Sequence, residues 1–287
     1  MPDEALEPME EQRPRNAAAV LLTPIAFVGG RALELLDHIG SMLLLLIEAM
    51  GWVLRSVRNR RVRLGYAAIV SQIVRVGARS LFIIALVSGA IGLILALQLA
   101  PPLAEYGQKE NVANIVGVAV LRELGPLIAA VVLTGFAGAA IAAEIGTMVV
   151  GEEIEALEAH ALNPVRFLVV PRVIASLVSM TALAVIADTV AIASALVTAM
   201  LALDIPYHTF MANLNQQVKP VDFYTGVGKG AIFGLLIGVI ACGNGLRVTG
   251  GAAGVGKATT ATVVESIVAI IIADMIFTAV FYVLGLV

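Results

Sequence analysis

Long apolar tracts dominate the chain after about residue 80. They cover about residues 80–100, 116–150, 167–203, 227–246 and 262–287. Because a helix needs about 20 apolar residues to cross the hydrocarbon core of a bilayer, the pattern predicts five membrane-spanning helices. The second and third tracts are too long for one simple span, so each is expected to break or to run past the membrane. Proline removes a backbone donor and crowds the preceding turn, which makes Gly125-Pro126 and Pro171 the expected break points.

The residues before these tracts show a different pattern. Residues 20–54 are largely apolar, but polar side chains interrupt them at Arg31, Glu34, Asp37, His38 and Glu48. We expect residues 17–64 to form an interfacial amphipathic helix on the cytoplasmic leaflet and a basic linker, with Trp52 at headgroup depth. The alternative is an additional true span, which would move the C-terminus to the other side of the membrane. The acidic residues 1–16 predict a disordered cytoplasmic tail, and residues 65–287 the five-span domain.

The composition supports this fold class, an all-α membrane protein. Apolar residues make up 60% of the 287 residues, charged residues only 14%, and the mean hydropathy is +0.97. A soluble domain carries about a quarter charged residues. The net charge of −3 gives no indication of nucleic-acid binding, and the lone Cys242 excludes an intramolecular disulfide. Three scattered histidines predict no metal site: His38, His160 and His208.

The distribution of arginine and lysine predicts the orientation. Residues 1–80 hold ten of the 18 basic residues, whereas the loop after the first predicted span offers only Lys109 against Glu105 and Glu110. The positive-inside rule therefore places the N-terminus in the cytoplasm. The loop at 151–166 is acidic, although the number of preceding spans makes it cytoplasmic.

Residues 150–163 predict a short acidic helix in that loop. Four apolar residues have the spacing of one helix face: Val150, Ile154, Leu157 and Ala161. The remaining positions carry four glutamates: Glu152, Glu153, Glu155 and Glu158. Anionic lipid of the cytoplasmic leaflet would repel this helix, so membrane anchoring is not expected. The pattern favours a docking element for another protein, with a merely solvated loop helix as the alternative.

Ionisable residues within the predicted spans are candidates for function. They are Arg122, Glu123, Glu144, Arg172, Asp188, Lys229, Glu265 and Asp274. Such groups cost several kcal/mol at membrane depth unless they are paired or hydrated. We expect Lys229 to pair with Glu123 or Asp274, and Arg122 with a carboxylate or a lipid phosphate. Glu144 and Arg172, near the cytoplasmic ends, are expected to snorkel or cap. The alternative for each group is a structural ion pair that holds the bundle together.

Two glycine patterns have structural explanations. Gly226, Gly230, Gly234 and Gly238 recur every fourth residue, which predicts close packing against another helix. The stretch GGAAGVGKATT at 250–260 has the glycine and lysine spacing of a phosphate-binding P-loop. However, Ala258 occupies the position of the magnesium-binding Ser or Thr, and no predicted strand precedes the glycines. This stretch is therefore expected to be a turn at which the chain re-enters the bilayer.

Four blocks of the sequence together resemble one protein family. They are GLILALQ (92–98), RELGPLIAAVVLTGFAGAAIAAEIGTM (122–148), EEIEALEAHALNPVRFLVVPRVIA (152–175) and GGAAGVGKATTATVV (250–264). In the same order, they resemble the MlaE/YrbE family, permease subunits of ABC transporters that move phospholipid in the Gram-negative envelope. The resemblance covers about residues 20–285. Phe136 departs from it, because the family usually has arginine there within an AGR-x-GA block, and no role of that arginine is carried over.

The resemblance implies a homodimeric permease of the bacterial inner membrane without enzymatic activity or a bound cofactor. ATP would be hydrolysed by a separate cytoplasmic subunit, and an MCE-domain protein would be the periplasmic partner. The helix at 150–163 would be the coupling helix, contacting the ATPase through Glu152, Glu153 and Leu157. Membrane phospholipid would be bound or gated by eight residues: Leu93, Leu97, Gln98, Arg122, Glu123, Leu124, Lys229 and Asp274.

Two alternative functions stay open at this point. One is a secondary transporter driven by protons through Glu123, Lys229 and Asp274, although no inverted sequence repeat is visible. The other is a passive membrane scaffold of an envelope complex, on which ATP would have no effect.

Overall fold

The computed structural model describes residues 17–58 and 65–285, and nearly all of them are helical. The predicted tail at 1–16 and part of the predicted basic linker, at 59–64, lie outside the described residues. The fold is that of an all-α membrane protein, as predicted. Its longer elements are α1 (Ala17–Arg58), α2 (Tyr66–Ile73), α3 (Arg79–Glu105), α4 (Val112–Ala119), α5 (Gly125–Leu133), α6 (Ala139–Val150), α7 (Glu153–Ala159), α8 (Val170–Ala202), α9 (Tyr207–Gln217), α10 (Pro220–Leu246) and α11 (Gly251–Val283).

Six helical segments of the described chain are long and apolar enough to cross a membrane. Five correspond to the tracts predicted as spans: Tyr66–Glu105, Lys109–Val150, Val165–Ala202, Pro220–Leu246 and Gly251–Val283. The sixth, Gly29–Ser56, belongs to α1. Length and composition thus admit both an interfacial and a spanning α1, and the interfacial placement stays a prediction.

The chain divides into two compact units, one up to Leu44 and one from Leu45 onward. Within the first, α1 exposes several large apolar side chains, including Leu33, Leu36 and Leu43. The second unit contains the helical bundle and every candidate site considered below.

The predicted breaks at Gly125-Pro126 and Pro171 are wrong. Instead, a π-helical turn comes directly before each proline-bearing helix: η3 (Val120–Leu124) before α5 and η5 (Val165–Val169) before α8. In both cases the residue before the proline donates its N–H to the carbonyl five residues earlier. A π-turn thus adjusts the hydrogen bonding where proline has no N–H, so the helix continues.

The uninterrupted segment Lys109–Val150 has 42 residues. At about 1.5 Å per residue it is about 63 Å long, roughly twice the thickness of the hydrocarbon core. The alternative expectation, extension beyond the membrane, therefore applies to this helix. Three further short elements remain. The π-turn η1 (Val74–Ala78) comes directly before α3, η2 (Lys109–Asn111) begins the segment Lys109–Val150, and η4 (Thr134–Gly138) lies between α5 and α6.

The helix α8 forms the centre of the bundle and packs against α3, α5 and α10. Small residues permit this close approach. A Cβ atom at Gly92 of α3 would collide with the backbone of Ala191 in α8. On α10, the predicted glycine face is in contact: Gly230, Gly234 and Gly238 face α8, and Gly226 faces the carbonyl of Leu121.

Replacing Gly234 with valine is expected to destabilise the protein by about 1–3 kcal/mol, the usual cost of overpacking a core. A Cβ there would lie 2.6 Å from both the Met180 Cβ and the Ser176 carbonyl oxygen. Gly228→Val is the matched control, because nothing lies within 4 Å of a Cβ at that position on the same helix. Thermal unfolding in detergent measures both, and equal melting temperatures would contradict the packing assignment.

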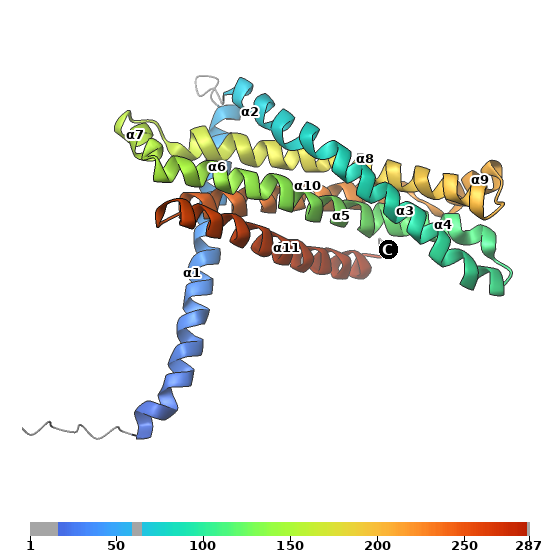
Figure 1. Cartoon of the computed structure of the whole chain (residues 1–287), viewed down its shortest axis with the longest axis horizontal. Helices are drawn as coiled ribbons and strands as arrows, with labels where there is room; N and C mark the ends of the chain where they lie inside the picture. Colours follow the sequence, from blue (N-terminus) through green and yellow to red (C-terminus); the bar gives the residue numbers. More distant parts are fainter. Residues whose placement is uncertain (1–16, 59–64, 286–287) are drawn as a thin grey trace, which may run out of the picture. The chain divides into compact units, whose positions relative to one another are not determined.

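The two ends of the bundle carry different elements. Figure 1 shows α7 at one end, near the starts of α2 and α11, and α9 at the opposite end. The first end contains the acidic loop, whereas the second contains η2, to which α9 is joined by a hydrogen bond from Asn213 Nδ2 to the Glu110 carbonyl, 2.9 Å.

Candidate functional site

A buried charged network joins three helices in the half of the bundle away from α7. Lys229 of α10 donates a hydrogen bond to Glu123 Oε2 of η3 at 2.6 Å, and its Nζ forms an ion pair with Asp274 Oδ1 of α11 at 2.9 Å. Thr278, one turn beyond Asp274, donates to Glu123 Oε1 at 2.9 Å and lies 3.1 Å from Lys229 Nζ. The structure therefore pairs Lys229 with both carboxylates proposed from the sequence.

The network is closed at its centre and open at one edge. The Lys229 side chain is 1% exposed, whereas the side chains of Asp274 and Glu123 are 17% and 36% exposed. One ammonium group between two carboxylates leaves one negative charge in excess. A charge in excess within an apolar bundle makes the network sensitive to rearrangement of any of its three helices, because an unpaired ion at membrane depth costs several kcal/mol.

Arg122 forms a separate pair beside this network. Its Nε donates to Asp222 Oδ1 at 2.6 Å, and Asp222 is fully buried. The other Asp222 oxygen accepts the backbone N–H of Lys219 at 2.7 Å, which satisfies a donor at the start of α10. The expectation of a carboxylate partner for Arg122 is thus met, and its guanidinium is already engaged without a lipid.

The sequence did not indicate two members of these networks, Asp222 and Thr278. Asp222 precedes the predicted tract at 227–246. It lies two residues after Pro220, and proline is common at the first position of a helix, so Asp222 could have been recognised as a residue of the first turn of α10. Thr278 lies four residues after Asp274 and therefore on the same helix face. That spacing alone does not distinguish it from other threonines.

Four of the eight residues expected to bind or gate lipid lie outside the two charged networks. Leu93, Leu97 and Gln98 are exposed on α3, whereas Leu124 is half-buried on η3. Within the described part of the chain, Gln98 joins neither charged network through a hydrogen bond. Leu93 and Leu97 therefore lie on an exposed apolar face of α3 rather than in an enclosed binding site.

The acidic helix predicted at 150–163 exists as the shorter α7 (Glu153–Ala159), and a left-handed residue flanks it on each side. Glu152 and Ala161, which flank it, have φ angles of 56° and 57°, a left-handed conformation uncommon for residues with a Cβ. At its end, Ala161 N–H donates to the Glu158 carbonyl at 2.8 Å and Leu162 N–H to the Leu157 carbonyl at 3.0 Å. These are the two bonds of a Schellman motif, which stops the helix at a defined angle.

The side chains of α7 follow the predicted pattern, whereas two members of the predicted apolar stripe, Val150 and Ala161, lie outside α7 and are exposed. The four glutamates are exposed, while Ile154 and Leu157 are half-buried against the chain. Of the proposed ATPase contacts, Glu152 and Glu153 are thus available to a partner, and Leu157 in part. The helix presents an acidic surface at the end of the bundle.

The remaining charges within the spans have individual environments. Arg172 does not snorkel: it is 5% exposed, donates to the Leu168 carbonyl at 2.9 Å and pairs with Glu144 at 3.2 Å. Glu265 accepts a hydrogen bond from Asn244 at 2.7 Å. Asp188 is 2% exposed, and its carboxylate fills the space left by the missing side chain of Gly125. This close approach explains why a glycine precedes Pro126.

Comparison with known proteins identifies the family. The family model described as Permease MlaE matches residues 69–280. The chain belongs to the MlaE permease family. A probable ABC transporter permease of Rickettsia bellii is 32% identical over 263 residues, which cover 92% of this chain and 99% of the relative. A probable ABC transporter permease of Synechocystis is 36% identical over 199 residues, 69% of this chain and 76% of the relative.

A plant protein is also similar. The chloroplast protein TRIGALACTOSYLDIACYLGLYCEROL 1 of Arabidopsis thaliana is 34% identical over 211 residues, 74% of this chain and 60% of the relative. As an MlaE permease, this chain is a transport subunit rather than an enzyme, and the ATPase activity of the transporter lies in a separate subunit.

The glycine-rich stretch of this MlaE permease is a turn and a helix start. Gly250 and Gly251 have φ angles of 82° and 70°, and α11 begins at Gly251 with Lys257 exposed within it. The described residues contain no β-strand from which a P-loop could emerge. A helix start without a preceding strand is not a P-loop, which agrees with an ATPase activity that lies in another subunit.

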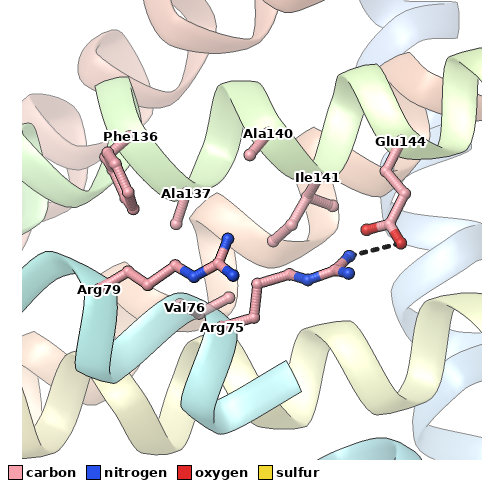
Figure 2. Close-up of a pocket in the computed structure, with 8 residues that line it drawn as sticks. All are labelled: Arg75, Val76, Arg79, Phe136, Ala137, Ala140, Ile141 and Glu144. Carbon is pink, nitrogen blue, oxygen red and sulfur yellow. Dashed lines mark hydrogen bonds and ion pairs between the residues drawn. The ribbon is translucent and has the colours of Figure 1, made fainter. Parts of the chain in front are cut away.

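The MlaE permease also has a pocket between the start of α3 and the helix formed by η4 and α6. Its volume is about 220 Å³. Phe136, the residue that departs from the family pattern, lines this pocket (Figure 2). Arg75 and Arg79 project into it from the facing helix, so the pocket contains guanidinium groups although residue 136 supplies none.

Proposed function

We propose that this permease moves phospholipid between the inner membrane and the periplasm or outer membrane, driven by ATP hydrolysis in its partner subunit. The observation that carries the proposal is the exposed apolar face of α3, with Leu93 and Leu97, on a transporter of this family. An acyl chain matches such a surface better than a polar solute does. The name of the Arabidopsis relative, which is that of a galactolipid, supports a lipid substrate.

Coupling to the ATPase is proposed to occur through α7. Closure of the ATPase subunits would press on the surface formed by Glu152, Glu153 and the exposed part of Leu157. Because both flanking residues hold defined backbone angles, α7 would move as one body with the helices α6 and α8. That movement would reach the Lys229 network, since α10 packs against both α6 and α8.

The orientation and partners complete the proposal. The α7 end carries a cluster of basic residues that includes Arg75, Arg166, Arg172, Arg247 and Lys257. The positive-inside rule therefore supports a cytoplasmic location for both the N-terminus and α7, in a protein of the bacterial inner membrane. A homodimer would cover part of the exposed apolar faces of α3 and α11, and an MCE-domain protein would receive or supply lipid on the periplasmic side.

The test is transport by the purified permease and its ATPase in proteoliposomes that contain labelled phospholipid. We expect lipid transfer to an acceptor protein only with hydrolysable ATP. Lipid transfer of equal rate without ATP would contradict the proposal. The buried Lys229 network is the observation that favours the alternative of proton coupling, which predicts flux by the permease alone under a pH gradient.

A further inference from the structure

The pocket between α3 and α6 contains more positive charge than its own carboxylate balances. Glu144 is the acidic residue that lines it, and Arg75 donates to Glu144 Oε1 at 2.6 Å. The same Glu144 oxygen lies 3.2 Å from Arg172, which approaches from α8. Arg75 and Arg172 thus share one carboxylate. Arg79 adds a third guanidinium beside them, so the cluster carries two positive charges in excess.

Arg79 is the unbalanced member of this cluster. Within residues 17–58 and 65–285 it has neither an ion pair nor a hydrogen bond through its side chain. Figure 2 shows its guanidinium directed into the pocket toward Ala137, between Phe136 and the side chain of Arg75. Arg79 is exposed at the surface of the bundle, so an anion from the surrounding bilayer can reach its guanidinium and complete the site.

The position of the pocket along the helices indicates where this anion comes from. Arg79 immediately precedes the apolar tract at 80–100, and Arg75 lies one turn closer to the α7 end. Arg79 therefore marks the border between headgroups and hydrocarbon, where long cationic side chains meet phosphate groups. The pocket walls are apolar beside Arg79, with Val76, Phe136 and Ile141, which suits the glycerol and upper acyl region of a lipid.

We propose that this pocket binds the phosphate of an anionic phospholipid from the cytoplasmic leaflet, with Arg79 as its main ligand and Arg75 as the second. Arginine suits this role because its planar fork of N–H donors matches phosphate oxygens. The inference extends the proposed function, on which it rests, by adding a headgroup site distinct from the Lys229 network. Arg172 and Glu144 hold Arg75 in place.

The test uses the purified permease–ATPase complex in detergent and a fluorescent phosphatidylglycerol as the probe. Arg79→Gln is expected to weaken its binding about tenfold, which corresponds to removing a charge-assisted hydrogen bond of about 1.4 kcal/mol. Ala140→Trp, which fills the pocket without changing its charge, is expected to weaken binding similarly. Lys257→Gln removes an exposed cation outside the pocket and should leave binding unchanged. Gel filtration confirms that each variant is folded.

Other ligands distinguish the possible sources of the anion. Fluorescent diacylglycerol, which lacks phosphate, should bind equally to the Arg79→Gln variant and the unmodified complex. Inorganic phosphate should displace phosphatidylglycerol only weakly. Displacement of phosphatidylglycerol by inorganic phosphate at concentrations similar to that of the lipid would overturn the lipid assignment in favour of a soluble anion.

Two further results would overturn the proposal without affecting the transport function. One is unchanged phosphatidylglycerol binding in both pocket variants. The other is unchanged lipid binding by an Arg79→Gln variant whose homodimer dissociates. That result would mean that Arg79 pairs with a carboxylate of a second copy of the chain. Conversely, Arg79-dependent binding by a complex that transfers no phospholipid would support the pocket and contradict the proposed function.

Discussion

Replacing Lys229 with methionine is expected to abolish ATP-driven lipid transfer and to lower the stability of the permease. Removing the ammonium group leaves Glu123 and Asp274 facing each other in an apolar bundle without a cation. Breaking a buried ion pair in this way costs about 3–5 kcal/mol. Transport in proteoliposomes and thermal unfolding in detergent measure the two effects.

A triple variant separates a functional network from a structural one. Combining Lys229→Met with Glu123→Gln and Asp274→Asn removes all three charges, which should restore most of the lost stability. If the network takes part in transport, the triple variant stays inactive although it is folded. Recovery of transport together with stability would show that the three residues only hold the bundle together.

Reversing the charges of Glu152 and Glu153 to lysine is expected to uncouple ATP hydrolysis from lipid transfer. Both side chains are exposed on the rigid end of the bundle, so the substitutions should not disturb folding. Placing like charges at an interface between complementary charged surfaces costs about 1.4–3 kcal/mol, so we expect lipid transfer per ATP to fall about tenfold or more. The measurement is the ratio of lipid transferred to ATP hydrolysed.

The control for this pair is on the same helix. Glu155→Lys with Glu158→Lys makes the same change in charge at exposed positions of α7. A smaller loss than that of the first pair is expected if Glu152 and Glu153 provide the main contacts. Normal transport by the Glu152→Lys, Glu153→Lys variant would show that the coupling surface lies elsewhere.

Apolar tract length was sufficient to predict the five spans after residue 65, because burial in a bilayer requires long continuous runs of apolar residues. The acidic helix α7 was predicted from its stripe of Ile154 and Leu157 for a similar reason. The effect of Pro126 and Pro171 was not predicted, since propensity treats proline as a breaker. In the structure both helices instead continue through π-turns, in which the residue before each proline bonds to the carbonyl five residues earlier.

The charged sites show where sequence information ends. The requirement to neutralise ions at membrane depth predicted the partners of Lys229, because few candidates exist among the spans. Asp222 was not predicted as the partner of Arg122, since the apolar tract at 227–246 underestimates the start of α10 by seven residues. The pocket of Arg75 and Arg79 was not predicted either, because its facing wall is about 60 residues away in the sequence and only the packing of α3 beside η4 and α6 brings them together.

The most direct test of the account is the accessibility of α7 to a membrane-impermeant maleimide. Cys242 is the only cysteine and is buried, so a Cys242→Ser, Glu158→Cys variant carries a single exposed thiol. We expect labelling in inside-out vesicles stripped of the ATPase, protection when the ATPase subunit is added back, and no labelling in right-side-out vesicles. Labelling from the outer face, with no protection by the ATPase, would contradict it.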